Sequence, residues 1–176
     1  RRALIAALED PDPQVRRAAG ESLREMGELD ALLPVLDGGS ARAQDEVIAA
    51  LAGRGGRARE AVLDWSARRM TEAEQLRAWG SALAGAQASP GLSGLRRMLY
   101  HSEAKVEQRV LRGLGSAGSA EAMHTVARGL RSKDRDLRSQ AVEALETIAD
   151  RRVSRAMIRL LEADATPSSP AAAAQT

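Results

Sequence analysis

Leucine returns along this chain at a nearly constant interval. One series advances in steps of 28, 32, 31 and 31 residues and comprises Leu23, Leu51, Leu83, Leu114 and Leu145. A second series keeps the same stride, with arginine in one place, and comprises Leu8, Leu36, Arg68, Leu99, Leu130 and Leu161. A fixed period of this size is typical of proteins built from stacked structural repeats. We therefore predict that the leucines of successive repeats meet in one continuous hydrophobic core.

The residues available for that core favour helices. Apolar residues make up 44% of the chain, but it holds only two Trp, one Tyr and no Phe. Leu and Ala are strong helix formers, and no run rich in β-branched and aromatic residues indicates a strand. The sequence therefore predicts an all-α fold.

Turn and capping signals divide each period into two helices. Asp12 and Pro13 are residue types preferred at a helix start, and Gly27 is typical of a helix end. Similar signals occur in the later periods, for example at Ser119 and Asp134. We predict about five and a half helical hairpins, filling a repeat domain of residues 1–163.

The middle periods diverge from this plan. In the third we expect a first helix over residues 57–70 and a second one that starts at a capping box formed by Thr71 and Glu74. The fourth period begins near Ser89 and is expected to break around residues 101–102. Each of these two periods is therefore predicted to hold two short helices.

Composition excludes several classes of site. The chain has no cysteine, which excludes disulfides, thiolate zinc sites and cysteine nucleophiles. Its two histidines stand in different repeats, without the converging ligands that a metal needs, so we predict no metal and no cofactor. No apolar run approaches the roughly 20 residues of a membrane-spanning helix, and no signal peptide opens the chain. We therefore expect a cytoplasmic protein.

The two ends of the chain point to a larger protein. Residues 164–176 are rich in Pro, Ser and Ala, and we predict a disordered linker or tail there. The chain starts within a helical pattern, and its last predicted helix, residues 153–162, has no second helix to pair with. We expect a fragment of a larger bacterial multidomain protein.

Two periods share a more specific motif. The first contains Leu8, Asp10, Val15, Arg16, Ala19, Leu23 and Gly27, and the fifth contains Leu130, Asp134, Leu137, Arg138, Ala141 and Leu145. This pattern resembles HEAT repeats, in particular the short HEAT-like repeats of bilin-lyase-related proteins. The resemblance implies antiparallel helix pairs stacked in a right-handed α–α superhelix, with the second helix of each pair lining the concave face. It implies no chemistry, so the expected function is that of a non-enzymatic scaffold or protein–protein interaction module.

Exposed residues of those second helices are the predicted contact surface for a protein partner or a neighbouring domain of the same chain. The candidates are Arg17, Glu21, Arg24, Gln108, Arg112, Ser139 and Glu143. Trp65 and Trp79 are instead predicted to lie in the core, because Trp79 occupies a repeat position that holds Ala or Val in the other periods.

A second candidate surface is basic. Arginines crowd the last helices and turns, at Arg128, Arg131, Arg135, Arg151, Arg152, Arg155 and Arg159. They are interpreted either as a surface for an anionic partner or as solvated residues paired with nearby acids.

Two other functions remain alternatives to the scaffold. Residues 89–176 carry a net charge of +4 against −2 for residues 1–88, which leaves room for nucleic-acid binding like that of HEAT-like DNA glycosylases. The overall charge of +2 is small for such a role, so nucleic acid is disfavoured as a partner. A bilin-lyase-like enzyme is the second alternative, and it rests on the repeat resemblance alone.

Overall fold

The structure, a computed structural model, describes residues 1–84, 89–149 and 151–165. Within these ranges the chain forms nine α-helices and no strand, which confirms the all-α prediction. In chain order the helices are α1 (Arg2–Ala7), α2 (Pro13–Glu25), α3 (Leu29–Gly38), α4 (Ala41–Leu51), α5 (Arg57–Ala84), α6 (Pro90–Ala117), α7 (Ala120–Leu130), α8 (Arg135–Ile148) and α9 (Arg151–Ala165). Of the predicted tail, residues 166–176 lie outside the described residues, and α9 continues through Ala165.

Short polar side chains begin most of the helices that follow a turn. The Asp12 carboxylate accepts a hydrogen bond from the backbone N–H of Gln14 at 2.8 Å, and Pro13 occupies the first turn of α2. Ser119 caps α7 and Asp134 caps α8 in the same manner. Each cap satisfies backbone donors that the first helical turn leaves without a partner. These helix starts agree with the sequence prediction.

The motif arginines stabilise the turns rather than pair with the capping aspartates. Arg16 donates from Nη1 to the carbonyls of Asp10 at 2.8 Å and Pro11 at 2.9 Å. In the fifth period Arg138 donates to the carbonyl of Ser132 at 3.0 Å. Because Arg presents several fixed donors, one side chain can hold a turn's backbone against the following helix.

The core runs through the whole described molecule. One cluster of buried apolar residues extends from Leu8, directly after α1, to Leu160 in α9. The leucines of the two repeat series that are buried in it are Leu8, Leu23, Leu36, Leu51, Leu114, Leu130 and Leu145. Among the other leucines of the two series whose side chains are described, Leu83 and Leu99 are only half-buried and lie in the outer part of the central hairpin. The side chain of Leu161 lies outside the described part of the structure. The continuous spine expected from the period is therefore present, with a gap at that hairpin.

The predicted breaks in the middle periods are wrong. α5 and α6 are each a single helix of 28 residues. The Thr71 hydroxyl donates to the carbonyl of Ala67 at 3.2 Å, four residues back, as Thr does inside a helix and not at its start. Residues 101–102 likewise lie within α6, and the helix continues through them without a break. The described chain thus holds four hairpins and a single last helix, instead of five and a half hairpins.

A matched pair of substitutions tests the continuity of α5. Thr71→Ala is expected to leave the free energy of unfolding unchanged or to raise it by up to about 0.7 kcal/mol, because alanine is the better residue inside a helix. Asp134→Ala, which removes a real cap, should lower it by about 1 kcal/mol. Urea denaturation followed by circular dichroism measures both. A loss of about 1 kcal/mol for Thr71→Ala as well would place a helix start at that residue.

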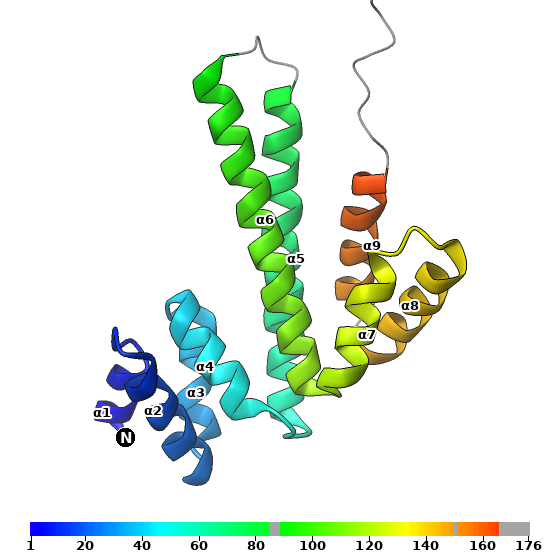
Figure 1. The fold of residues 1–176 in the computed structure, drawn as a ribbon. Helices are drawn as coiled ribbons and strands as arrows, with labels where there is room; N and C mark the ends of the chain where they lie inside the picture. The colour runs from blue at the N-terminus through cyan, green and yellow to red at the C-terminus, as the bar shows by residue number, and fades with distance from the viewer. Residues whose placement is uncertain (85–88, 150, 166–176) are drawn as a thin grey trace, which may run out of the picture.

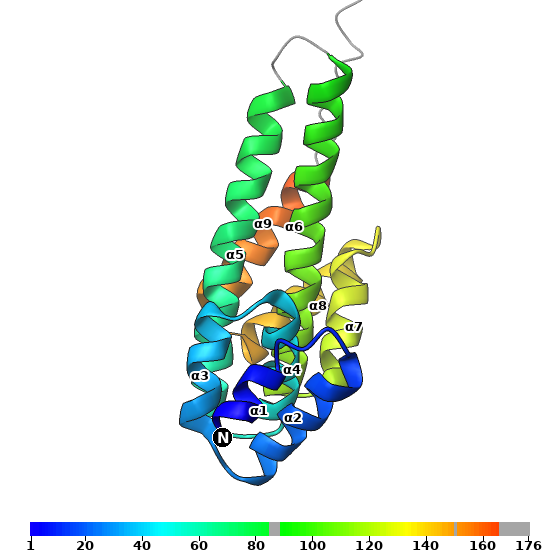
Figure 2. The same cartoon turned by 90° about the vertical axis from the view of Figure 1, so that its left-hand side faces the viewer.

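The long α5–α6 hairpin stands at the centre of the molecule (Figure 1). α3 and α4 pack against one side of its base, and α1 and α2 continue the stack outward from them. On the other side α9 packs against α5 and α7 packs against α6, while α8 lies outside them (Figures 1 and 2). The hairpin is therefore covered from two sides at its base.

The outer part of the hairpin projects beyond its neighbours (Figures 1 and 2). A helix of 28 residues is about 42 Å long, whereas the 11 residues of α4 span only about 16 Å. Arg77 of α5 marks the boundary, since its Nε donates to Glu103 Oε1 on α6 at 2.8 Å and its Nη1 donates to the Leu160 carbonyl on α9 at 3.0 Å. We call residues 78–84 and 90–102, beyond this contact, the arm.

Candidate interaction surfaces

The seven residues predicted to contact a partner are all exposed. They comprise Arg17, Glu21 and Arg24 on α2, Gln108 and Arg112 on α6, and Ser139 and Glu143 on α8. α4 connects the first two groups, because it packs against both α2 and α6. α8 packs mainly against α7 and α9 and is set apart from α6 by α7 (Figure 1). The residues on α8 therefore lie apart from the other five, and the role of the whole set stays a prediction.

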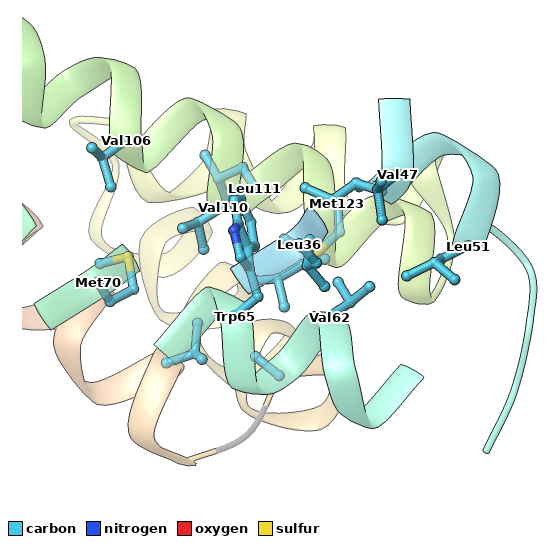
Figure 3. Packing of buried hydrophobic residues seen from close by; sticks show 14 of the residues in the cluster. Leu36, Val47, Leu51, Val62, Trp65, Met70, Val106, Val110, Leu111 and Met123 are labelled. Atoms are coloured by element: carbon cyan, nitrogen blue, oxygen red, sulfur yellow. The ribbon is translucent and has the colours of Figure 1, made fainter. Parts of the chain in front are cut away.

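The two tryptophans have opposite environments. Trp65 is 1% exposed, as predicted, and packs between α5 and α6 with Val62 and Val110 around it (Figure 3). Trp79 is 52% exposed, so the prediction that it is a core residue is wrong. The error arises because α5 continues through Thr71 as one helix instead of ending there. Trp79 therefore lies on the arm and not in a second helix packed within the stack.

Exposed apolar side chains concentrate on the arm. Seven large apolar residues are exposed in the described chain, and four of them lie there: Trp79, Leu95, Met98 and Tyr100. Tyr100 turns toward α5, since a β-carbon placed on Gly80 would lie 3.1 Å from its ring. Trp79, Leu95 and Met98 remain for solvent or a partner. Sequence reasoning missed the last two, although apolar residues three apart in one helix already indicate a shared face.

These three side chains lie on one side of the arm. Residues 11 apart in a helix point within about 20° of each other, because three turns take 10.8 residues. Met98 stands 11 residues before Arg109, which donates to Asp45 of α4 at 2.8 Å. Trp79 stands 11 residues after Arg68, which pairs with Asp37 of α3. The apolar face of the arm therefore continues the side of the hairpin that α3 and α4 cover at its base.

We call Trp79, Leu95 and Met98 the arm face. At the base of the same side, α4 buries Val47 and Ile48 in the common core, beside the Asp45–Arg109 ion pair. This side of the hairpin is covered by a helix at its base and open along the arm. Large exposed apolar patches are uncommon in proteins unless they bind something, so the arm face is a candidate interaction site.

The carboxylate of Glu9 has a displaced pKa, and its contacts are structural. Glu9 accepts hydrogen bonds from Ser40, including one from the backbone N–H at 2.9 Å, and these interactions hold the pKa of Glu9 below its ordinary value. The contact ties the end of α1 to the start of α4. Among the described residues no three His, Asp or Glu side chains gather closely enough to hold a metal ion.

Fold and surfaces together define a helical-repeat protein with one core running through its stacked hairpins. Two family models match the chain, one described as HEAT repeat over residues 1–29 and one described as HEAT repeats over residues 92–176. The chain belongs to the HEAT repeat family, as its motifs predicted. The unmatched residues between them include α3, α4 and α5.

Two further comparisons complete this picture. Neither a search of curated proteins nor a search of solved structures found a match. In the described part of the chain, no helix combines the length and the apolar character needed to cross a membrane. HEAT repeats generally serve as scaffolds that bind other proteins, so the exposed surfaces are the features that bear on function.

Proposed function

We propose that this chain is a non-enzymatic protein-interaction module whose arm face binds an amphipathic helix, supplied by a partner protein or by a neighbouring domain of the same protein. The observation that carries the proposal is that Trp79, Leu95 and Met98 are all exposed, on a hairpin that projects beyond its neighbours (Figure 1). Aromatic residues and Met are enriched in the centres of protein interfaces and contribute a large share of their binding energy.

A helix is the natural occupant because α4 already shows how this side of the hairpin is covered. α4 packs against the hairpin with an apolar stripe and places Asp45 against Arg109. A second amphipathic helix lying next to α4, farther along the arm, would bury the arm face in the same way. Leu95 and Met98 stand three residues apart on α6 and so lie on one face of that helix, where a partner helix could pack its own apolar stripe.

Site-directed photo-crosslinking in the full-length protein tests the proposal. A photoreactive residue at position 98 should crosslink to one defined segment, identified by mass spectrometry, and the segment should be an amphipathic helix. Met26 at the end of α2 is the matched control, since it is 55% exposed against 68% for Met98 but lies far from the arm. Crosslinking at position 26 should be absent or unspecific.

Substitutions then separate the arm face from the surface predicted by sequence. Leu95→Glu combined with Trp79→Ala should abolish the crosslink at position 98. The charge reversals Arg24→Glu and Arg112→Glu should leave it intact if the arm face is the binding surface. Loss of the crosslink in the second variant alone would assign binding to the α2–α6 surface instead. The cytoplasmic location, the bacterial origin and the larger multidomain context stay predictions.

A further inference from the structure

A basic cleft lies between α5 and α9. Its volume is about 500 Å³. Five arginines line it, namely Arg68, Arg151, Arg152, Arg155 and Arg159, and they face two carboxylates, Asp64 and Glu74. The cleft therefore carries an excess of positive charge although the whole chain has a net charge of only +2.

Three of these arginines already have acidic neighbours. Arg152 donates to Asp64 at 3.0 Å, and Arg159 donates from Nε to Glu74 at 2.9 Å. Arg68 pairs with Asp37 of α3. All three pairs are largely open to solvent, where an ion pair contributes only about 0–1 kcal/mol. Such contacts are easily exchanged for the carboxylates of a ligand.

The other two arginines, Arg151 and Arg155, are exposed, and within the described ranges neither has a carboxylate at ion-pair distance. They stand four residues apart on α9, and Arg159 follows at the same interval. Residues at this interval lie one above another on one face of a helix, about 6 Å apart. α9 thus presents a short row of guanidinium groups along the cleft.

We propose that this cleft binds an acidic segment of a protein, through carboxylates that meet Arg151 and Arg155. Arg is suited to this role because its planar guanidinium holds a carboxylate through two parallel hydrogen bonds. Asp64 and Glu74 favour a peptide over a nucleic acid, because a continuous row of phosphates would be repelled by two fixed carboxylates in the same cleft, whereas a peptide can place neutral residues beside them. None of the three arm-face residues lines the cleft, so the two proposals can be tested separately.

Fluorescence anisotropy with the complete chain tests this proposal. The probe is a labelled peptide that alternates glutamate with serine, and its glutamine counterpart serves as the neutral comparison. At low ionic strength the chain should bind the glutamate peptide and not the glutamine peptide. Arg151→Gln with Arg155→Gln should weaken binding at least about tenfold, and the double reversal to Glu should abolish it. Added salt should weaken binding of the unmodified chain.

Three controls make the outcome decisive. Arg42→Glu with Arg128→Glu makes the same change in charge as the double reversal, at exposed positions away from the cleft. Compared at about 0.1 M salt, where charges more than about 10 Å apart are largely screened, this variant should keep the affinity within about twofold. Trp79→Ala should not affect peptide binding, which separates this cleft from the arm face. Thermal denaturation of each variant shows that the fold is kept. The proposal is overturned if the glutamate peptide does not bind, if the cleft and control variants lose affinity equally, or if a single-stranded oligothymidylate binds more tightly than the peptide and depends on the same two arginines.

Discussion

Replacing Trp65 with alanine should lower the free energy of unfolding by about 3–5 kcal/mol, which is typical when a fully buried tryptophan is truncated. Trp65 lies where three helices meet (Figure 3). Its ring touches α6 so closely that a β-carbon on Gly113 would lie 3.1 Å from Cζ3, and the guanidinium of Arg109 sits 5.4 Å from the ring centre. Because Arg109 in turn binds Asp45 and Gln44 of α4, the cavity left by Trp65→Ala loosens the joint between the second hairpin and the third.

Urea denaturation followed by circular dichroism measures this loss, since the substitution itself alters the fluorescence signal. A chain of this size loses about 2–4 °C of melting temperature per kcal/mol, so the expected shift is on the order of 10 °C. Trp79→Ala is the matched control, because the same side chain is removed from an exposed position. It should change stability by no more than about 0.5 kcal/mol. Similar losses for the two variants would contradict the placement of Trp79 on the arm.

Replacing Arg77 with methionine should lower the free energy of unfolding by about 3–5 kcal/mol, as happens when one partner of a buried ion pair is removed. Arg77, which belongs to α5, contacts two other helices at the base of the arm, through Glu103 on α6 and the Leu160 carbonyl on α9. Glu103 is 3% exposed, so replacing the guanidinium with an apolar side chain removes a charged hydrogen-bond donor from a buried carboxylate. The large effect therefore comes from the carboxylate that remains rather than from the contact that is lost.

Two comparisons isolate that cause. Arg159→Met breaks the solvent-exposed pair with Glu74 at the same α5–α9 contact and should lower stability by less than about 1 kcal/mol. Adding Glu103→Gln to Arg77→Met should restore part of the loss, because the neutral amide is less costly to bury than a carboxylate. Chemical denaturation of the unmodified chain, Arg77→Met, Glu103→Gln and the double variant gives the coupling free energy between Arg77 and Glu103. If Glu103→Gln deepened the loss instead, the buried charge would not be its source.

Much of the architecture was predictable because its signals are local or periodic. The leucine interval identified the stacked hairpins, and Leu23, Leu51, Leu114 and Leu145 are all buried as it required. Capping residues located the helix starts at Pro13, Ala120 and Arg135, since a cap acts through hydrogen bonds to residues two or three positions away. The exposure of Arg24 and Arg112 also follows from their place opposite the core positions of their own helices.

The candidate sites were less accessible to such reasoning. The arm face depends on α5 continuing past Thr71, and a threonine followed by an acidic residue is compatible with a helix start and with a helix interior. The basic cleft depends on α9 packing against α5, more than 80 residues earlier in the chain. The arginines of α9 were identified as candidates from the sequence, but their neighbours on α5 were not.

The sequence alone determined that this chain forms stacked α-helical hairpins around one aliphatic core, because periodic leucines and local caps act over a few residues and tolerate variation between repeats. Only the tertiary structure decided where that stack opens into a projecting arm and which charged residues meet across it. The contacts of Arg77 with Glu103 and Leu160 join residues that are 26 and 83 positions apart in the chain. Such buried tertiary contacts contribute more free energy than the small differences in helix propensity among the residues of α5. No sequence pattern within a single repeat indicates which distant residues will meet.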